Sequence, residues 1–161
     1  MFSFKKTTEK PVPETLVDRL KNFLSLKEFR YEEIPERNMI KTGIRGKNLS
    51  WHVYLRADEE RNLISISSVL PLYADDVQKL KIADLLNRIN YRTLLGTWCL
   101  DNEDGEISYT IFHLTDGNNI TDSQLDIIFD TCCRSVDNFF PAIASVNYGN
   151  AEPVIAFNSI F

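Results

Sequence analysis

The stretch Asp84–Leu114, DLLNRINYRTLLGTWCLDNEDGEISYTIFHL, decides the fold that we expect for this chain. Its beginning is the end of an amphipathic helix over Asp75–Asn90, in which apolar residues recur at helical spacing. Two β-prone segments follow, Leu95–Leu100 and Ile107–Leu114, and the acidic loop Asp101–Glu106 joins them. This stretch therefore predicts a helix followed by a β-hairpin.

Upstream, the pattern predicts another helix and a meander of strands. Apolar residues share one helical face from Leu16 to Leu24, and Pro13 and Glu14 suit the first turn. Strands are expected over Met39–Ile44, Leu49–Asp58 and Leu63–Leu70, with Phe29–Ile34 as a short strand or an extended lead. In the turn after the first of these strands, Gly46 is expected to take a positive φ.

Downstream, a third helix begins at a capping box. The side chains of Thr121 and Gln124 are spaced so that each satisfies the other's backbone N–H group. Pro141 should kink or end this helix, although Ile143 and Val146 would continue its apolar face.

These elements predict an α+β fold with a single domain. We expect a curved antiparallel sheet with helices packed on it, in the order helix, three or four strands, helix, two strands, helix. Residues 1–12 are interpreted as a flexible N-terminal lead, residues 13–149 as the domain, and residues 150–161 as an apolar C-terminal tail.

Composition excludes several classes of protein. With 161 residues, 43% hydrophobic and 25% charged, the chain has the make-up of a globular protein with one core. Its apolar runs are far shorter than the roughly 20 residues that span a bilayer, and its start lacks a signal sequence, so we expect a cytoplasmic protein without a membrane segment. Three cysteines form an odd, sparse set that disfavours a disulfide framework.

Charge is distributed unevenly along the chain. The net charge is −5, and residues 93–161 contain ten acidic residues and a single basic one, Arg134. Such a segment repels phosphate, so no nucleic-acid partner is expected. It either is a solvated acidic face or suits a basic partner, including the basic N-terminal half of a second copy in a homodimer.

Three motifs resemble the YbjN family. They are Asp84–Asn90, the hairpin Leu100–Tyr109 and SVDNFFPAI over Ser135–Ile143, followed by a closing Gly149. The resemblance covers Thr15–Gly149 and implies a bacterial sensory transduction regulator with a fold similar to type III secretion chaperones. It implies no catalytic residue and no cofactor. The family tends to place a glycine between the first helix and the first strand, where this chain has Lys27-Glu28-Phe29-Arg30-Tyr31.

The residues give little indication of a catalytic site or a metal site. The acidic hairpin loop does not fit a calcium loop, because Gly105 stands at position five and Phe112 at position twelve of the pattern. His52 and His113 have no ligands or catalytic partners at close spacing, and no nucleophile motif surrounds the serines. We therefore expect no enzyme, no metal and no cofactor.

Binding fits the sequence better. Trp51 and Trp98 are either core residues or interface residues, whereas Tyr54 lies on the polar side of its strand. The tail is apolar and β-prone, and it should pack on its own sheet, on a second copy, or on a partner by strand addition. The candidate protein-binding residues are Tyr54, Val154, Ile155, Phe157 and Phe161.

The leading hypothesis is a non-enzymatic protein-binding module, chaperone-like or regulatory. It would hold a protein or an extended peptide on a face or an edge of its sheet. The alternative is a domain that senses a small molecule or signal in a pocket between the sheet and the helices.

Overall fold

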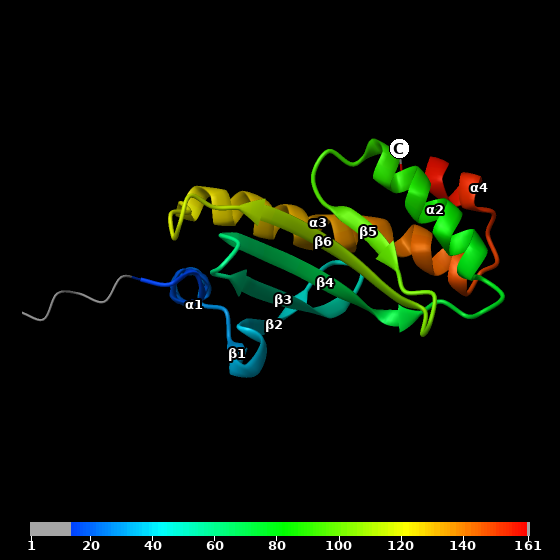
Figure 1. Cartoon of the computed structure of the whole chain (residues 1–161). Coiled ribbons are helices and arrows are strands. Elements are labelled where there is room, and N and C mark those ends of the chain that lie inside the picture. The colour runs from blue at the N-terminus through cyan, green and yellow to red at the C-terminus, as the bar shows by residue number, and fades with distance from the viewer. Residues whose placement is uncertain (1–13, 161) are drawn as a thin grey trace, which may run out of the picture.

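One curved antiparallel sheet of six strands organises residues 14–160, the part of the chain that the computed structural model describes (Figure 1). The strands are β1 (Tyr31–Ile34), β2 (Met39–Arg45), β3 (Ser50–Asp58), β4 (Leu63–Tyr73), β5 (Thr97–Leu100) and β6 (Glu106–Leu114). The helices are α1 (Leu16–Leu26), the short 3-10 helix η1 (Pro35–Arg37), α2 (Lys79–Arg92), α3 (Asp122–Asn147) and α4 (Pro153–Asn158). This order confirms the predicted single-domain α+β fold.

The strand order is β1-β2-β3-β4-β6-β5, so β6 lies between β4 and β5. The chain leaves β4, forms α2, returns along the edge strand β5 and turns back as β6. Residues of β4 and β6 that lie more than forty positions apart in the sequence therefore face each other, as Ser67 and Thr110 do. This non-local pair of strands forms the floor of the site described below.

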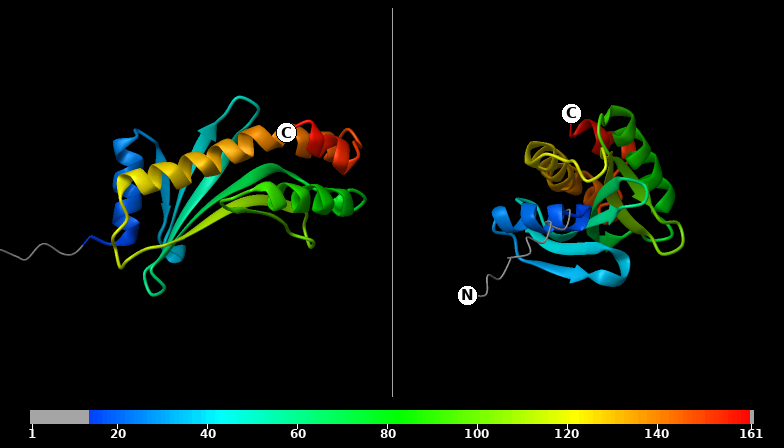
Figure 2. Two further views of the ribbon diagram at one scale, coloured as in Figure 1. Left: turned by 90° about the horizontal axis from the view of Figure 1, so that it is seen from above. Right: turned by 60° about the vertical axis from the view of Figure 1, so that its left-hand side comes forward.

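The helices cover one face of the sheet, and α3 runs along its length (Figure 1, Figure 2). Strand β3 shows how the sequence produces this arrangement. Trp51, Val53 and Leu55 alternate with exposed or half-buried residues and are at most 4% exposed. They belong to one continuous core with the buried faces of α1, α2 and α3. Side chains of β3 therefore alternate between the core and the opposite face of the sheet.

Both tryptophans belong to this core, which resolves the alternatives left by the sequence. Trp98 is 2% exposed and packs on Tyr109 and Phe139. Trp51 donates its indole N–H to the hydroxyl of Ser68 at 3.0 Å, and Ser68 in turn lies 3.3 Å from the sulfur of Cys132. Burial raises the pKa of the Cys132 thiol to about 11, so this cysteine acts as a small core residue.

The join between α1 and β1 shows how the chain turns without the glycine that the family tends to place there. The N–H of Phe29 bonds to the carbonyl of Leu24, and the N–H of Glu28 bonds to that of Ser25. These bonds form a Schellman motif, whose left-handed position is usually glycine. Here Glu28 occupies that position with φ +60°. The join therefore keeps its glycine-type geometry although the residue differs.

The turn between β2 and β3 departs from the prediction. Gly46 is not among the residues with a positive φ, so its role is different. A Cβ at this position would lie 2.3 Å from the carboxylate of Asp137 and 2.9 Å from the ring of Trp51. The glycine is required by this close approach of the turn to α3, not by its own backbone conformation.

Helix α3 continues through Pro141 to Asn147, so the helix does not end at the proline, and Ile143 and Val146 continue its buried face. Proline lacks an N–H group and leaves the carbonyl four residues earlier, that of Asp137, without its helical donor. The side-chain amide of Asn48 donates to this carbonyl at 2.8 Å. The carboxylate of Asp137 also accepts the N–H groups of Lys47 and Asn48, at 2.9 and 2.8 Å. The β2–β3 turn thus supplies the hydrogen-bond donor that the Asp137 carbonyl lacks within the helix.

The start of the second helix also differs from the prediction. Helix α2 begins at Lys79, and neither Asp75 nor Asp76 caps it with a side chain. Val77 and Leu80, the first apolar residues of the predicted helix, are 86% and 85% exposed. Val77 precedes the helix, and Leu80 lies two positions before Ile82, on the side of the helix opposite its buried face.

At the first helix, Thr15 is the N-cap and forms a capping box with Asp18, so Glu14 precedes the helix. Pro13 lies outside the described residues. At the third helix, the predicted capping box of Thr121 and Gln124 is confirmed.

The C-terminal tail is helical, although its composition is β-prone, and it adds no strand to its own sheet. Pro153 stands in the first turn of α4, where its missing N–H is not needed. Pro153 and Ala156 are buried, and α4 contacts α2 and α3. The tail therefore packs within its own chain, on helices and not on the sheet, and its packing on a second copy or on a partner stays a prediction.

Candidate functional site

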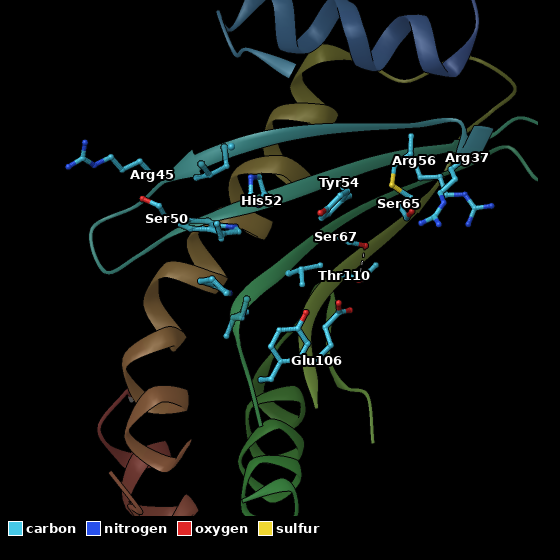
Figure 3. A pocket seen from close by; sticks show the side chains of 18 of the residues that line it. Arg37, Arg45, Ser50, His52, Tyr54, Arg56, Ser65, Ser67, Glu106 and Thr110 are labelled. Atoms are coloured by element: carbon cyan, nitrogen blue, oxygen red, sulfur yellow. Dashed lines mark hydrogen bonds between the residues drawn. The ribbon is translucent and has the colours of Figure 1, made fainter. Parts of the chain in front are cut away.

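A hollow of about 1000 Å³ lies on the face of the sheet opposite the helices (Figure 3). Its lining comes from η1 and from four neighbouring strands, β2, β3, β4 and β6, with the outward-pointing residues of each strand predominating. Charged, hydroxyl and aromatic residues are mixed in it: Arg37, Arg45, Ser50, His52, Tyr54, Arg56, Ser65, Ser67, Tyr73, Glu106, Thr110 and Phe112.

Small side chains on the central strands create the hollow. Ser67 of β4 stands between Tyr54 of β3 and Thr110 of β6 in one cross-strand row. The hydroxyls of Ser67 and Thr110 are 2.9 Å apart and hydrogen-bonded. In the next row, Ser65 stands between Arg56 and Phe112. Because short hydroxyl residues lie between longer neighbours, the centre of this face is lower than its sides.

The lining is basic although the protein is acidic. It contains Arg37, Arg45 and Arg56, and the single acidic residue of the lining is Glu106, within the described part of the chain. None of the three guanidinium groups forms an ion pair with another residue of the described range 14–160. Unpaired guanidinium groups are free to bind carboxylates or phosphates in bidentate geometry.

The arginines lie at two ends of the hollow. Arg45 pairs with Ser50 at the start of β3, and Arg56 lies near the end of the same strand, beside Arg37 (Figure 3). His52 and Tyr54 lie between them on β3. An occupant that runs along β3 would meet positive charge at both ends and an aromatic ring in between.

The edge strand β5 is less suited to binding. The side-chain amide of Asn90 accepts the N–H of Trp98 at 2.8 Å and donates to its carbonyl at 3.0 Å. These are the contacts that a neighbouring strand would make, so the amide occupies the middle of this edge. At the other edge, β1 carries two exposed charged residues, Glu32 and Glu33.

A smaller hollow of about 220 Å³ lies between α2 and β5. Asn90, Trp98 and Leu100 are among its lining residues. The indole N–H of Trp98 is buried and has no hydrogen-bond partner. This hollow lies where the alternative hypothesis expects a pocket, between the sheet and a helix, but it has room for only a small molecule.

The candidate residues from the sequence are not brought together. Tyr54 lines the large hollow, as its position on the strand suggested. Val154 and Ile155 are exposed on α4, on the helical side of the molecule, and Phe157 is partly buried there. Phe161 lies outside the described residues.

The three arginines and the hydroxyl floor were not among the candidate residues predicted from the sequence. A signal was present, since the polar side of β3 is Ser50, His52, Tyr54 and Arg56. Pairing it with the polar side of β4 would have shown one continuous polar surface.

Two negative findings concern residues 14–160. No group of three or more histidine, cysteine, aspartate or glutamate side chains in this range is arranged to hold a metal ion. No helix in the same range is both long enough and apolar enough to cross a membrane.

The chain belongs to the YbjN family. Residues 16–145 match this family, which is described as "Putative bacterial sensory transduction regulator". The fold is similar to a solved structure described as "Crystal structure of YbjN, a putative transcription regulator from E. coli", with a TM-score of 0.59 and 14% sequence identity. The match covers 75% of this chain and 85% of the other. The search of curated proteins gave no match.

Proposed function

We propose that this chain is a non-enzymatic, regulatory protein-binding module of the bacterial cytoplasm, and that the large hollow holds its partner. The observation that carries the proposal is the 1000 Å³ hollow on a sheet face that no described helix covers. It combines exposed aromatic side chains with unpaired charged ones, and this mixture is typical of surfaces that bind proteins. The description of the family as a regulator, not as an enzyme, agrees with this role.

The structure favours the face of the sheet over its edges as the binding surface. Asn90 blocks the middle of β5, and charged side chains flank β1. A peptide on the face would bind mainly through side chains, whereas a peptide on an edge would bind through backbone hydrogen bonds. The side chains that β3 and β4 present to the hollow carry hydroxyl, aromatic and guanidinium groups, which suits the first mode.

A photo-crosslinking residue at position 54 tests this proposal. The variant is expressed in the native host, irradiated, and analysed by mass spectrometry for the crosslinked segments. We expect segments of one or a few proteins, and loss of these crosslinks when Ser67→Arg fills the floor of the hollow. The matched control carries the crosslinker at Ile127, which is 58% exposed on α3. Identical products from positions 54 and 127 would contradict the proposal.

We also propose that the chain forms a homodimer through α4. Val154 and Ile155 are 42% and 64% exposed on this helix, and α2 beside it exposes Leu80 and Tyr91. Exposed apolar side chains on two helices that pack together are of the kind that a second copy would cover. Light scattering measures the mass directly. We expect a dimer for the natural chain and a monomer for Val154→Ser/Ile155→Ser; a natural chain that is monomeric at all concentrations would refute the dimer.

The small hollow at Trp98 supports a second candidate function, the sensing of a small molecule. A ligand with one acceptor atom would satisfy the buried indole N–H, which has no partner. Thermal shift against a panel of metabolites tests it, because a ligand that binds only the folded protein raises its melting temperature. We expect a specific stabilisation that Trp98→Phe, which lacks the N–H group, removes. Stabilisation that persists in Trp98→Phe would place the ligand elsewhere.

A further inference from the structure

We propose that the occupant of the large hollow is an extended peptide segment with acidic side chains at both ends and an apolar side chain between them. This inference rests on the proposed function and adds the chemistry of the partner. It follows from three features of the lining: the sign of its charge, the separation of its charges, and the character of its centre.

The sign of the charge is opposite to that of the whole protein. The chain carries a net charge of −5, yet the hollow exposes three arginines and one glutamate. In the described part of the chain, Arg37, Arg45 and Arg56 have no carboxylate within ion-pair distance, while ten ion pairs form elsewhere. Three unpaired guanidinium groups on one face therefore indicate an anionic partner.

The separation of the charges indicates an elongated partner. Arg45 lies opposite Ser50, and Arg56 follows six positions later along β3. At about 3.3 Å per residue, the two positions are about 20 Å apart. A single phosphate or carboxylate cannot reach both. An extended peptide covers the same distance with about six residues. Two carboxylates separated by about six positions would meet both arginines.

The centre of the hollow suits an apolar side chain. Tyr54 and Phe112 border the hydroxyl floor, and Phe112 is 65% exposed. Covering these rings removes apolar surface from water, while the floor of Ser67 and Thr110 leaves room for a side chain above it. Glu106 lies at the side of the hollow away from β3 (Figure 3). There it would repel a third carboxylate of the peptide, so the acidic side chains of the peptide would be restricted to positions near the arginines.

A nucleic acid fits these charges less well. Its phosphates repeat at every nucleotide, so a bound strand would extend beyond the arginines onto the rest of an acidic protein. Residues 93–161 contain ten acidic residues and one basic residue, and β6 of this segment forms one side of the hollow. Charge restricted to two positions, as on a peptide, matches the lining better.

Selection from a displayed library of random twelve-residue peptides tests the inference with the full chain. We expect enriched peptides with acidic residues about six positions apart and an apolar residue between them. One enriched peptide is then labelled, and its affinity is measured by fluorescence anisotropy at two salt concentrations. Higher salt should weaken binding, because it screens the ion pairs at the exposed ends of the hollow.

Single substitutions assign the ends. We expect Arg45→Gln and Arg56→Gln each to weaken binding about tenfold, since each removes a charge-assisted hydrogen bond. Arg134→Gln is the matched control, because it removes the same charge from an exposed position on α3 and should leave the affinity unchanged. All three side chains are exposed, so the variants should fold.

Five outcomes would overturn the inference. Enriched peptides without acidic residues, or with binding unchanged in Arg45→Gln/Arg56→Gln, would show that the arginines do not select the partner. Tighter binding of a labelled single-stranded DNA of equal length would make the partner a nucleic acid. A dimer that dissociates only in the double variant would place a second copy in the hollow. If no peptide is enriched, the occupant of the hollow is not an extended peptide.

The proposed function can survive some of these results. If Ser67→Arg abolishes the binding of enriched peptides that lack acidic residues, the hollow is still a protein-binding site and only the chemistry of the partner is refuted. If Ser67→Arg leaves every enriched peptide bound, the proposed function itself fails.

Discussion

The two faces of the sheet are built from the same strands and differ in almost every other respect. On β4, Ser68 is buried and accepts the indole N–H of Trp51, while its neighbour Ser67 is half-buried in the open hollow. One face is packed by three helices, and the other carries unpaired charges. Adjacent residues of one type therefore have different roles, and the direction of the side chain determines which role each has.

This difference separates the residues that stabilise the fold from the residues that are available for binding. The covered face supplies the burial of apolar surface that stabilises the fold. The open face contributes little to that core, so its residues can serve binding without loss of the fold. Substitutions on the two faces should therefore separate stability from binding.

The largest expected difference lies within β3. Trp51→Ala removes a ring that is 4% exposed and should lower the free energy of unfolding by about 3–5 kcal/mol. Tyr54→Ala, three residues along the same strand, should lower it by less than about 1 kcal/mol, because Tyr54 lies on the open face. Urea denaturation measures both. Equal losses would show that the open face is part of the stabilising core.

The next effect concerns the corner where the hairpin meets β4. Gly105 has φ +84°, and a Cβ there would lie 2.4 Å from the carbonyl oxygen of Ala74. Gly105→Val should destabilise by about 2–4 kcal/mol, from the left-handed backbone and the clash. Gly43→Ala is the control, since no atom lies within 4 Å of its added Cβ. Calcium should not shift the melting temperature of either protein; a shift would revive the rejected calcium loop.

The two adjacent serines give a sharper comparison with less change in volume. Ser68→Ala leaves the buried indole N–H of Trp51 without an acceptor and should cost about 1–3 kcal/mol. Ser67→Ala loses one hydrogen bond on the open face and should change stability by less than about 0.5 kcal/mol. Thermal unfolding of both variants checks the order. A larger loss for Ser67→Ala would reverse the assignment of the faces.

The smallest expected effect on stability concerns β5, the edge strand at which both faces of the sheet end. Asn90→Ala removes two hydrogen bonds to the backbone of Trp98 and should lower stability by about 1 kcal/mol. It also exposes the edge, so the variant should associate more readily as its concentration rises. Asn87→Ala, an exposed position on the same helix, is the control. Identical light-scattering curves for the two variants would show that the amide does not protect the edge.

Local patterns in the sequence were sufficient for much of the fold. The β-prone segment Leu49–Asp58 predicted β3, and the acidic loop Asp101–Glu106 predicted the hairpin, in which Gly105 has a positive φ. The capping box at Thr121 marked the start of α3. Each of these signals depends on residues a few positions apart, so they can be interpreted without knowledge of the tertiary structure.

The predictions that failed depend on contacts between distant segments. Pro141 does not end α3, because Asn48, more than ninety positions earlier, supplies a donor for the carbonyl that proline leaves open. Gly46 is required by the approach of α3, and the tail is a helix because α2 and α3 offer a surface for it. None of these partners is visible in the segment itself.

The hollow belongs to this second group. Its floor forms only because β6 is inserted beside β4, which brings Thr110 next to Ser67. The sequence placed Tyr54 on the polar side of its strand but gave no reason to join it to residues of β6. Candidate sites on a sheet face therefore need the strand order before they can be assembled.

The link between the β2–β3 turn and Asp137 makes the two layers mechanically dependent. Arg45 and Ser50, at one end of the hollow, flank a turn whose backbone is anchored to α3 at the proline. A load applied to Arg45 is therefore transmitted to the middle of the longest helix, or else it breaks three hydrogen bonds. Binding at this end of the hollow would therefore affect α3, although α3 lies on the opposite face of the sheet and does not contact the bound partner.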